Sequence, residues 1–290
     1  MDIKRCTLCP NECKADRTSG TGLCHVPAEA LVCRAALHPW EEPIISGTCG
    51  SGTVFFAGCS LSCVFCQNYE ISHRRAGRIY TVDELIRAMQ NLVDEGAHNI
   101  NFVNPTHYAH ILKEALTRYR PPVPVVYNSG GYDKVETLRE LEGLIDIYLP
   151  DLKYLTPETA LRYSGRRNYP DVAKAAIDEM LRQTGEPIVE DGIMRRGVIV
   201  RHLVLPGQSD ESVRVMNYLT ERYEERIYIS AMSQYIPHGR ADEFPEINRR
   251  LLPIEYKRAV AALRRAEQKN CFIQEESSAN EEYIPAFTTE

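Results

Sequence analysis

Residues 53–66 read Thr53-Val54-Phe55-Phe56-Ala57-Gly58-Cys59-Ser60-Leu61-Ser62-Cys63-Val64-Phe65-Cys66. The first five residues carry no charge and are mostly β-branched or aromatic, which predicts a short buried strand. Three cysteines follow at the spacing Cys-x3-Cys-x2-Cys, on a tight loop directly after that strand. Cofactors in α/β proteins bind where parallel strands end, so this loop is the first candidate for a functional site.

Five more apolar runs follow the cysteine loop, and enough chain for a helix separates each from the next. The predicted strands are residues 53–57, 99–103, 123–127, 145–149, 198–205 and 226–230. Amphipathic segments lie between them. In the first of these, Thr81 and Glu84 form a capping box, and the helix ends before Gly96. Apolar strands that alternate with helices predict a parallel sheet covered by helices, either open or curled into a partial barrel.

The chain has 290 residues, a formal net charge of -6 and ten cysteines, nine of them within the first 66 residues. The acidic balance argues against nucleic acid as the main partner, and no apolar run is long enough to cross a membrane. The first residues do not form an apolar signal segment, so we expect a cytoplasmic protein. Thiols stay reduced in the cytoplasm, where clustered cysteines indicate metal ligands rather than disulfides.

These features divide the chain into three parts. Residues 1–50 are a cysteine-rich metal-binding segment and linker, residues 51–270 form the α/β barrel, and residues 271–290 form a tail. The length suits one large domain with a small appendage.

The spacing of Cys59, Cys63 and Cys66 suits an iron–sulfur cube. Three thiolates can hold three irons of a [4Fe–4S] cluster and leave the fourth iron open, as catalytic metal sites keep an open position. A small molecule with an amine and a carboxylate could chelate that iron. The alternatives are a zinc knuckle, with His73 as its fourth ligand, and three thiols buried in the core.

The sequence resembles the radical S-adenosylmethionine (SAM) superfamily, whose signature is Cys-x3-Cys-x-aromatic-Cys, here with Phe65 in the aromatic position. Residues 128–131, 148–153 and 199–210 follow in the order seen in pyruvate formate-lyase activating enzymes. The amino-terminal Cys-x-x-Cys-Pro motif and residues 36–43 are similar to the PflX-like branch of that family. The resemblance covers essentially the whole chain and implies a partial (βα)6 TIM-type barrel of parallel strands.

The resemblance also implies the chemistry. The cluster would bind the amine and carboxylate of SAM, and an external one-electron donor such as flavodoxin or ferredoxin would reduce it. Cleavage of the sulfonium bond would yield a 5′-deoxyadenosyl radical, which would abstract hydrogen from a protein or peptide substrate. Three alternatives stay open: radical modification of a small molecule or ribosomal peptide, a non-enzymatic iron–sulfur or zinc scaffold, and a metal-free thiol oxidoreductase.

Catalysis would rest on the three loop cysteines, and further residues match SAM-contacting positions of the family. The candidates are Phe65, Asn104, Ser129, Asp151, Lys153, Arg201, His202 and Gln234. Asp151 can accept from ribose hydroxyls and Lys153 can meet the SAM carboxylate; a surface ion pair is the alternative. Arg201 and His202 are neighbours in one strand, so only one of them can face the lumen. We favour Arg201 there and a hydrogen-bonded structural role for His202.

A second metal site is indicated by four amino-terminal cysteines: Cys6, Cys9, Cys13 and Cys24. Only one Cys-x2-Cys pair is present among them, which favours an auxiliary [4Fe–4S] cluster over structural zinc, with free thiols as the third option. Cys33 or Cys49 could replace one of the four. Residues 67–270 contain no cysteine, unlike activating enzymes that carry extra clusters in an insertion after the cysteine loop.

Two histidines, His107 and His110, lie three residues apart near the start of a predicted helix. This spacing would allow both to bind one metal ion. We expect instead that they lie on a solvent-facing surface of that helix.

Overall fold

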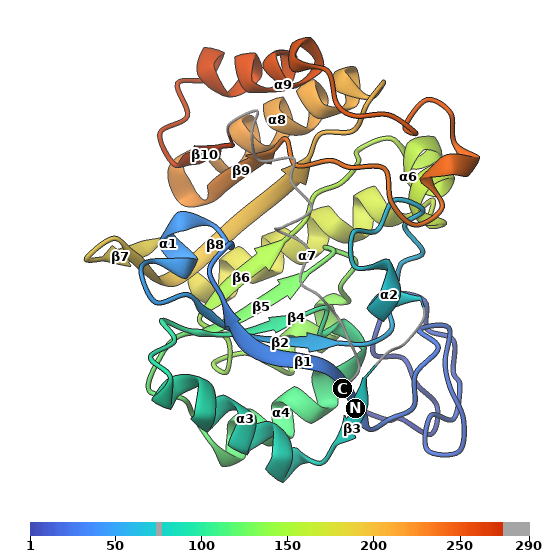
Figure 1. Cartoon of the computed structure of the whole chain (residues 1–290), viewed down its shortest axis with the longest axis vertical. Helices are drawn as coiled ribbons and strands as arrows, with labels where there is room; N and C mark the ends of the chain where they lie inside the picture. Colours follow the sequence, from blue (N-terminus) through green and yellow to red (C-terminus); the bar gives the residue numbers. More distant parts are fainter. Residues whose placement is uncertain (74–76, 275–290) are drawn as a thin grey trace.

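One twisted sheet organises the part of the chain that the computed structural model describes, residues 1–73 and 77–274 (Figure 1). Its strand order is β10-β9-β8-β6-β5-β4-β2-β1-β3, and β7 (Ile188–Glu190) pairs with β8 beside this path. All six predicted strands are present and parallel: β2 (Ser51–Phe56), β4 (Ile100–Val103), β5 (Val125–Ser129), β6 (Ile147–Pro150), β8 (Ile193–Leu203) and β9 (Tyr228–Met232). Successive parallel strands are neighbours, as in a (βα) barrel, but β10 and β3 end the sheet and leave the barrel partial.

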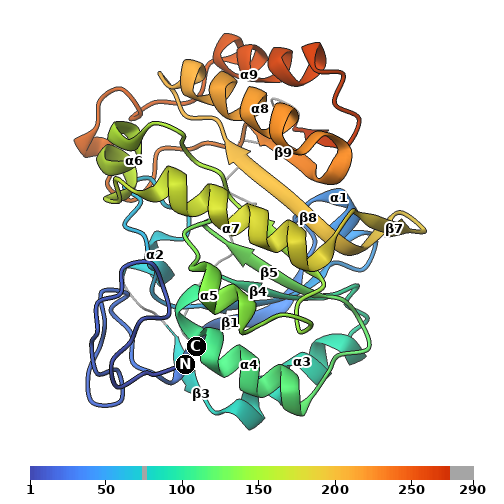
Figure 2. The same ribbon diagram turned by 180° about the vertical axis from the view of Figure 1, so that it is seen from behind.

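Helices cover one face of the sheet, which is seen from behind in Figure 2. They are α3 (Val82–Asp94), α4 (Ala109–Arg118), α5 (Val135–Arg139), α6 (Pro157–Ser164), α7 (Tyr169–Thr184), α8 (Ser209–Tyr223) and α9 (Pro253–Arg265). The predicted capping box of α3 is confirmed, since Glu84 N–H donates to Thr81 Oγ1 at 3.2 Å and Thr81 N–H donates to Glu84 Oε2 at 2.8 Å. In the described ranges, no helix is long and apolar enough to span a membrane.

The sheet also contains strands that the apolar pattern does not predict. β1 (Ala30–His38) pairs antiparallel with β2 and with β3 (Arg78–Tyr80), although it lies within the predicted cysteine-rich segment 1–50. The sequence of β1, Ala30-Leu31-Val32-Cys33-Arg34-Ala35-Ala36-Leu37-His38, is mostly apolar, but most of the strand is only half-buried. β10 (Cys271–Ile273) lies at the start of the predicted tail and pairs parallel with β9. The sheet therefore extends past both predicted boundaries; residues 275–290 lie outside the described part.

A short helix, α1 (Pro43–Ser46), lies on the sheet face opposite the long helices (Figure 1). β1 pairs His38 with Ser51, so the chain leaves β1 at the end where β2 begins. Ile45 is then buried in a cluster with inward-facing residues of β5, β6 and β8: Val126, Ile147, Leu149, Met194 and Ile199. α1 therefore closes the amino-terminal end of the partial barrel and forms a floor inside it.

We predict that Ile45→Ala lowers the free energy of unfolding by about 3 kcal/mol, because it leaves a cavity in a fully buried cluster. Ile44→Ala, at the half-buried neighbouring position, is the matched control and should cost clearly less. Urea unfolding followed by circular dichroism measures both variants. Equal losses would contradict the packing of α1 into the barrel.

Candidate active site

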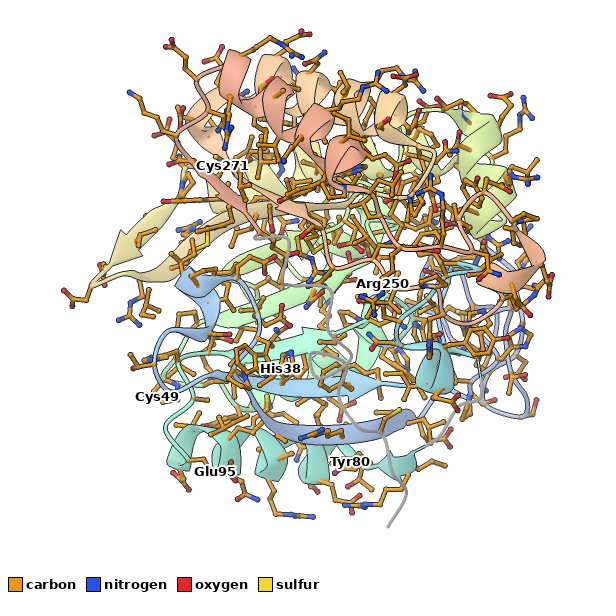
Figure 3. The ribbon with its side chains drawn as sticks, turned by 45° about the horizontal axis from the view of Figure 1, so that its top comes forward. His38, Cys49, Tyr80, Glu95, Arg250 and Cys271 are labelled. Carbon is orange, nitrogen blue, oxygen red and sulfur yellow. The ribbon has the colours of Figure 1, made fainter. Side chains whose placement is uncertain are left out.

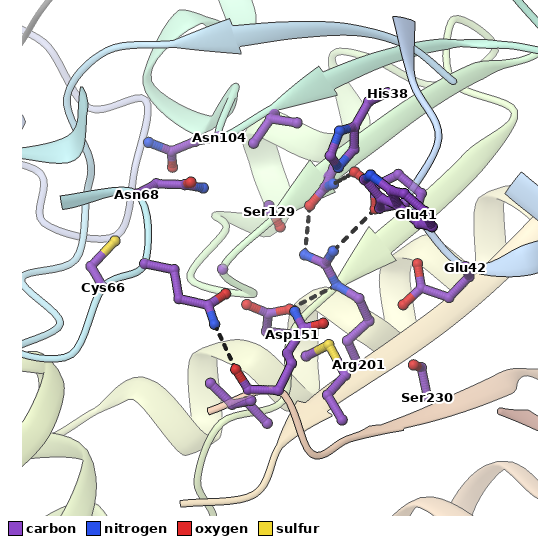
Figure 4. A pocket seen from close by; sticks show the side chains of 18 of the residues that line it. His38, Glu41, Glu42, Cys66, Asn68, Asn104, Ser129, Asp151, Arg201 and Ser230 are labelled. Carbon is purple, nitrogen blue, oxygen red and sulfur yellow. Dashed lines mark hydrogen bonds and ion pairs between the residues drawn. The ribbon is translucent and has the colours of Figure 1, made fainter. Parts of the chain in front are cut away.

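A cavity of about 520 Å³ lies on the sheet face that the long helices leave open. It extends from the cysteine loop after β2 to the α1 floor, and Figure 4 shows it from close by. Nearly all the site residues expected from the sequence line it: Cys59, Cys63, Phe65, Cys66, Asn104, Ser129, Asp151, Lys153, Arg201 and Gln234. The fold thus brings residues from six strand ends into one place.

Each thiol of the cysteine loop has a polar neighbour. The contacts are Leu61 N–H to Cys59 Sγ at 3.4 Å, Ser72 Oγ to Cys66 Sγ at 3.3 Å, and Ser164 Oγ with Cys63 Sγ at 3.0 Å. N–H and O–H groups that donate to sulfur stabilise metal-bound thiolates. The surroundings of the trio therefore suit metal ligation.

Burial controls the protonation of these thiols. It raises the pKa of Cys66 to about 11 and raises the pKa values of Cys59 and Cys63, against the favourable charge of Lys153. The free thiols are therefore protonated at neutral pH. A metal centre that binds them must displace their protons. Its positive charge must also offset the cost of burying the thiolates. The trio fits a cationic cluster in this respect.

The single-metal alternative has less support from the geometry. Within residues 1–73 and 77–274, no three Cys, His, Asp or Glu side chains converge where one metal ion could bind. His73, the alternative fourth ligand, stacks on Tyr69 with ring centroids 4.2 Å apart, and its Nδ1 lies 2.8 Å from Ser72 Oγ. The side chain of His73 is thus held by Tyr69 and Ser72.

Asn104 follows β4 and has a left-handed backbone, with φ +60°, which asparagine tolerates better than most residues. Its side-chain amide donates to Gly58 O, and its Oδ1 accepts from Cys59 Sγ at 3.5 Å. Both contacts join the end of β4 to the start of the cysteine loop. Asn104 therefore positions the loop as well as lining the cavity.

Ser129 ends β5 and is held by a buried carboxylate. Its hydroxyl donates to Asp133 Oδ2 at 2.5 Å and accepts from Gly131 N–H at 3.2 Å. Asp133 also accepts from Thr106 Oγ1 at 2.6 Å and from Tyr127 OH at 2.9 Å. Burial raises the pKa of Asp133, although these hydroxyls favour its ionised form. Ser129 is thus fixed at the cavity wall.

A buried ion network, the Arg201 network, crosses the cavity and contains Glu41, Asn128, Asp151, Lys153 and Arg201 (Figure 4). Arg201 Nε donates to Asp151 Oδ1 at 3.0 Å, and Lys153 Nζ donates to the other Asp151 oxygen at 2.5 Å. Arg201 Nη1 donates to Glu41 Oε2 at 3.4 Å, and Nη2 donates to Asn128 Oδ1 at 2.6 Å. Burial opposes the charge of Asp151, but Lys153 and Arg201 outweigh it and lower the pKa of that carboxyl.

Glu41 and Glu42 belong to the site, although the sequence analysis uses them only as markers of the PflX-like branch. Both line the cavity floor. Glu41 accepts from Asn101 Nδ2 at 3.1 Å and from Asn128 Nδ2 at 3.2 Å, in addition to Arg201. The available sequence signal is a pair of adjacent acidic residues in an otherwise unassigned linker. Only the antiparallel path of β1 shows that this pair enters the barrel.

His202 does not reach the cavity. Its Nδ1 donates to Leu152 O at 2.7 Å, and its Nε2 lies 2.9 Å from Ser212 Oγ of α8. Alternation along β8 turns Arg201 toward the cavity and His202 toward the helices. Burial lowers the pKa of His202 to about 4, so the ring is neutral. The expectation that His202 contacts the cofactor is therefore wrong, because its side chain lies in the helix layer and is hydrogen-bonded there.

Phe65 and Gln234 connect the cysteine loop to the end of β9. Phe65 is buried and packs edge-on against Tyr235, with ring centroids 6.0 Å apart. Gln234 O accepts from Gln67 Nε2 at 2.9 Å, and Gln234 Oε1 accepts from Gln274 Nε2 at 3.0 Å. These contacts hold one side of the cavity together at its cysteine-loop end.

Comparison with known proteins identifies the family. Residues 53–219 match the radical SAM superfamily. The chain belongs to this superfamily. Uncharacterized protein MJ0674 of Methanocaldococcus jannaschii is 31% identical over 278 residues, which cover 92% of this chain and 76% of that protein. Membership implies a radical SAM enzyme that uses a [4Fe–4S] cluster and SAM.

Solved structures agree with the fold at low sequence identity. Streptococcus suis SuiB matches with a TM-score of 0.51 and 12% identity, over 78% of this chain and 48% of SuiB. Methylornithine synthase (PylB) matches with a TM-score of 0.50 and 12% identity, over 73% of this chain and 61% of that enzyme. The chain thus spans less than two thirds of either structure, and these likenesses concern the radical SAM fold alone.

The four amino-terminal cysteines of this radical SAM protein also lie together. Cys6, Cys9 and Cys24 are buried, and Cys13 is half-buried. Burial raises the pKa of Cys9 to about 11, and the neighbouring Cys24, Cys6 and Cys13 add to that rise. The spacing-based grouping of these four residues therefore corresponds to a cluster of thiols in space.

The amino-terminal segment packs directly on the cysteine loop. Gly58 has φ +76°, and a Cβ at this position would lie 2.6 Å from Cys24 O, so glycine permits the close approach. Asn11 Nδ2 donates to Ser60 O at 2.8 Å, and Arg166 Nε donates to Asn11 Oδ1 at 2.6 Å. The two groups of thiols are therefore parts of one packed unit.

Arg17 is a buried cation that the sequence analysis misses. It is 0% exposed, and Nε donates to Val26 O at 3.3 Å while Nη2 donates to Pro27 O at 2.5 Å. Nη1 donates to His107 O at 2.5 Å and lies 3.8 Å from Cys6 Sγ. Among the described residues, no carboxylate forms an ion pair with it. A buried guanidinium without a carboxylate favours negative charge on the nearby sulfurs.

His107 and His110 are covered by the amino-terminal segment, so the expectation of a solvent-facing surface is wrong. His107 Nε2 donates to Ala57 O at 2.8 Å, and His110 Nε2 donates to Ala28 O at 3.0 Å. Burial lowers the pKa of His107 to about 3 and that of His110 to about 4. Both rings are neutral and structural, because residues 17–28 lie over this part of the barrel.

The other candidate cysteines lie elsewhere. Cys33 of β1 packs against Phe55, Ile71 and Val103. Cys49 is exposed, and Figure 3 places it at the end of the molecule opposite the amino-terminal segment. The structure thus favours the original set of four cysteines over a set that includes Cys49.

Glu211 of α8 holds the loop after β6 that carries Lys153. Its carboxylate accepts from Leu155 N–H at 2.6 Å, from Thr156 N–H at 2.7 Å and from Thr156 Oγ1 at 2.6 Å. Burial opposes its charge, but Thr156 and Arg214 outweigh burial and hold the pKa of Glu211 below its usual value.

We predict that Glu211→Gln lowers the free energy of unfolding at pH 7 by about 1–3 kcal/mol through loss of charged hydrogen bonds. Because the folded pKa lies below the unfolded value near ~4.3, the contribution is complete above that value and is lost as the pH falls through the folded pKa. The difference from wild type should be constant from about pH 6 to 8 and shrink below about pH 4.

Urea unfolding across this pH range measures the effect. Glu221→Gln, at an exposed position on the same helix, is the control and should show little change at any pH. A Glu211→Gln difference that is as large at pH 3 as at pH 7 would contradict the assignment of an ionised, hydrogen-bonded carboxylate.

Proposed function

We propose that the chain cleaves SAM reductively and that the 5′-deoxyadenosyl radical then abstracts hydrogen from a protein or peptide residue, as in activating enzymes of the pyruvate formate-lyase type. A [4Fe–4S] cluster on Cys59, Cys63 and Cys66 would supply the electron and the open iron for that cleavage. The observation that carries the proposal is a single cavity that combines these three thiols with the buried Arg201 network.

The chain's own side chains would bind and orient SAM. Lys153 can bind the SAM carboxylate because its ammonium has donors beyond the one given to Asp151. Asp151 can accept from ribose hydroxyls with lone pairs that Lys153 and Arg201 do not use. Leu61, Phe65 and other apolar residues of the lining would exclude water from the radical.

Two features support a protein or peptide substrate: the resemblance to the PflX-like branch and the open edge of the sheet. Residues 199–210 support an activating enzyme of the pyruvate formate-lyase type. Residues 36–43 and the amino-terminal Cys-x-x-Cys-Pro motif support its PflX-like branch. The sheet ends at β10 and β3 without closing, which gives a polypeptide loop a side by which to enter. The alternative is a small molecule or ribosomal peptide, and the closed α1 floor of the cavity favours this reading.

We predict that Cys63→Ala abolishes 5′-deoxyadenosine formation after anaerobic reconstitution and reduction, because one iron loses its protein ligand. Cys271→Ala, which removes a thiol outside the cavity lining, is the control and should keep the activity. Chromatography of the quenched reaction measures the nucleoside. Full activity in Cys63→Ala would instead support a non-enzymatic scaffold or a thiol oxidoreductase.

A second [4Fe–4S] cluster on Cys6, Cys9, Cys13 and Cys24 is the further part of the proposal, with structural zinc as the alternative. The buried Arg17 next to Cys6 supports a site that carries negative charge as thiolates. Contact between this segment and the cysteine loop supports an electron path from a donor such as flavodoxin or ferredoxin. Clustered cysteines of this kind indicate metal ligands in a reducing compartment, which supports the proposed cytoplasmic location.

We predict about eight irons per chain after anaerobic reconstitution, and about four in Cys9→Ala, because each cluster holds four. Cys49→Ala is the matched control and should keep about eight. Iron, sulfide and zinc are measured by elemental analysis. About four irons with one zinc in the wild type would establish the mixed alternative instead.

A further inference from the structure

Glu42 lies on the cavity floor beside Glu41 and is 8% exposed. The Ser230 hydroxyl donates to its carboxylate, but Oε2 is buried and has no hydrogen-bond partner among the described residues. Figure 4 shows this carboxylate directed into the cavity, beside Arg201 and Ser230. Buried carboxylate oxygens in native proteins normally have donors, so the position indicates a donor that residues 1–73 and 77–274 do not provide.

Arg201 does not supply that donor. Its three guanidinium nitrogens are directed at Asp151, Glu41 and Asn128. Glu41 accepts from three side chains, whereas the adjacent Glu42 keeps one oxygen without a partner. The two neighbouring carboxylates therefore differ in role: Glu41 completes the Arg201 network, and Glu42 faces the space above the floor.

The charges on the cavity lining also indicate a missing cation. Glu41, Glu42 and Asp151 are three carboxylates, and they face two cations, Lys153 and Arg201. An oxidised [4Fe–4S] cluster with three thiolates would carry one negative charge, and SAM bound to its open iron through a neutral amine and a carboxylate would carry no net charge, so neither would offset the carboxylates. The excess negative charge stays on the floor of the cavity, and one further cation would neutralise it.

We propose that the substrate presents an ammonium or guanidinium group, which binds Glu42 on the cavity floor. This inference rests on the proposed radical SAM function and names the chemical class of its substrate. In Figure 4, Glu42 and Cys66 lie on opposite sides of the cavity. A cation held at Glu42 therefore directs the rest of the substrate toward the cysteine loop. A small amine or guanidine and the lysine or arginine side chain of a polypeptide share this chemistry.

The test measures binding by the full chain, anaerobically reconstituted with iron and sulfide and supplied with SAM. The probes are n-butylammonium, n-butylguanidinium, n-butanol and butyrate, which share one chain length, and isothermal titration calorimetry follows them without turnover. The two cations should bind the wild type, and their affinity for Glu42→Gln should be about tenfold lower. Glu179→Gln, which changes a buried carboxylate of α7 outside the cavity, should bind them as the wild type does.

Equal cation affinity in the wild type and Glu42→Gln, or equally tight binding of butanol or butyrate, overturns the inference. Glu42→Asp keeps the charge and should retain most of the affinity, and thermal melting followed by circular dichroism shows that each variant is folded. If both Glu42 variants unfold, cation binding to the wild type and its absence for butanol and butyrate still decide the question.

A blocked tripeptide, acetyl-Gly-Lys-Gly-amide, distinguishes the two sources of the cation. If the tripeptide competes with n-butylammonium, the cation belongs to a polypeptide. If n-butylammonium binds and the tripeptide does not compete, the cation belongs to a small molecule. Both results uphold the inference. SAM cleavage is assayed separately through 5′-deoxyadenosine. Cleavage without cation preference removes this inference alone, whereas cation binding without cleavage upholds the Glu42 site and removes the proposed function.

Discussion

The buried guanidinium of Arg201 is the charge around which the barrel interior is arranged. A cation in the middle of a parallel sheet is stable only when carboxylates and carbonyls face it, and here they come from three different parts of the chain. Asp151 comes from the end of β6, Asn128 from β5, and Glu41 from the linker that follows β1. The requirement to neutralise one strand residue therefore ties the amino-terminal linker to the sheet.

This constraint explains the position of β1 and α1. An antiparallel strand beside β2 carries the chain back to the amino-terminal end of the barrel, where a parallel strand could not deliver it. The linker then enters the barrel at its amino-terminal end. Ile45 packs in the apolar interior, and Glu41 forms an ion pair with Arg201. Apolar packing and ion pairing thus act on adjacent residues of one turn, and the cavity receives a charged floor as a consequence.

The sequence predicts the parts of this structure that depend on local pattern. Six apolar runs identify the six parallel strands, the Thr81 capping box begins α3, and strand alternation separates Arg201 from His202. The place of Glu41 in the Arg201 network and the role of Glu42 could not be predicted, because Glu41 contacts Arg201 from 160 positions away and Glu42 contacts Ser230. β1 is not predicted, for another reason: its mostly apolar sequence contains three alanines, a residue that is depleted in strands, and it does not alternate between apolar and polar residues.

The amino-terminal segment follows the same logic of buried charge. Arg17 is fully buried among carbonyls and thiols, without a carboxylate partner in the described part of the chain, so its positive charge favours thiolate at the nearby Cys6. The same segment covers His107 and His110 and approaches Gly58 so closely that a side chain there would clash. A change that released the amino-terminal thiols would therefore expose a buried cation and loosen the strand end from which the cysteine loop begins. The two groups of thiols are coupled through packing.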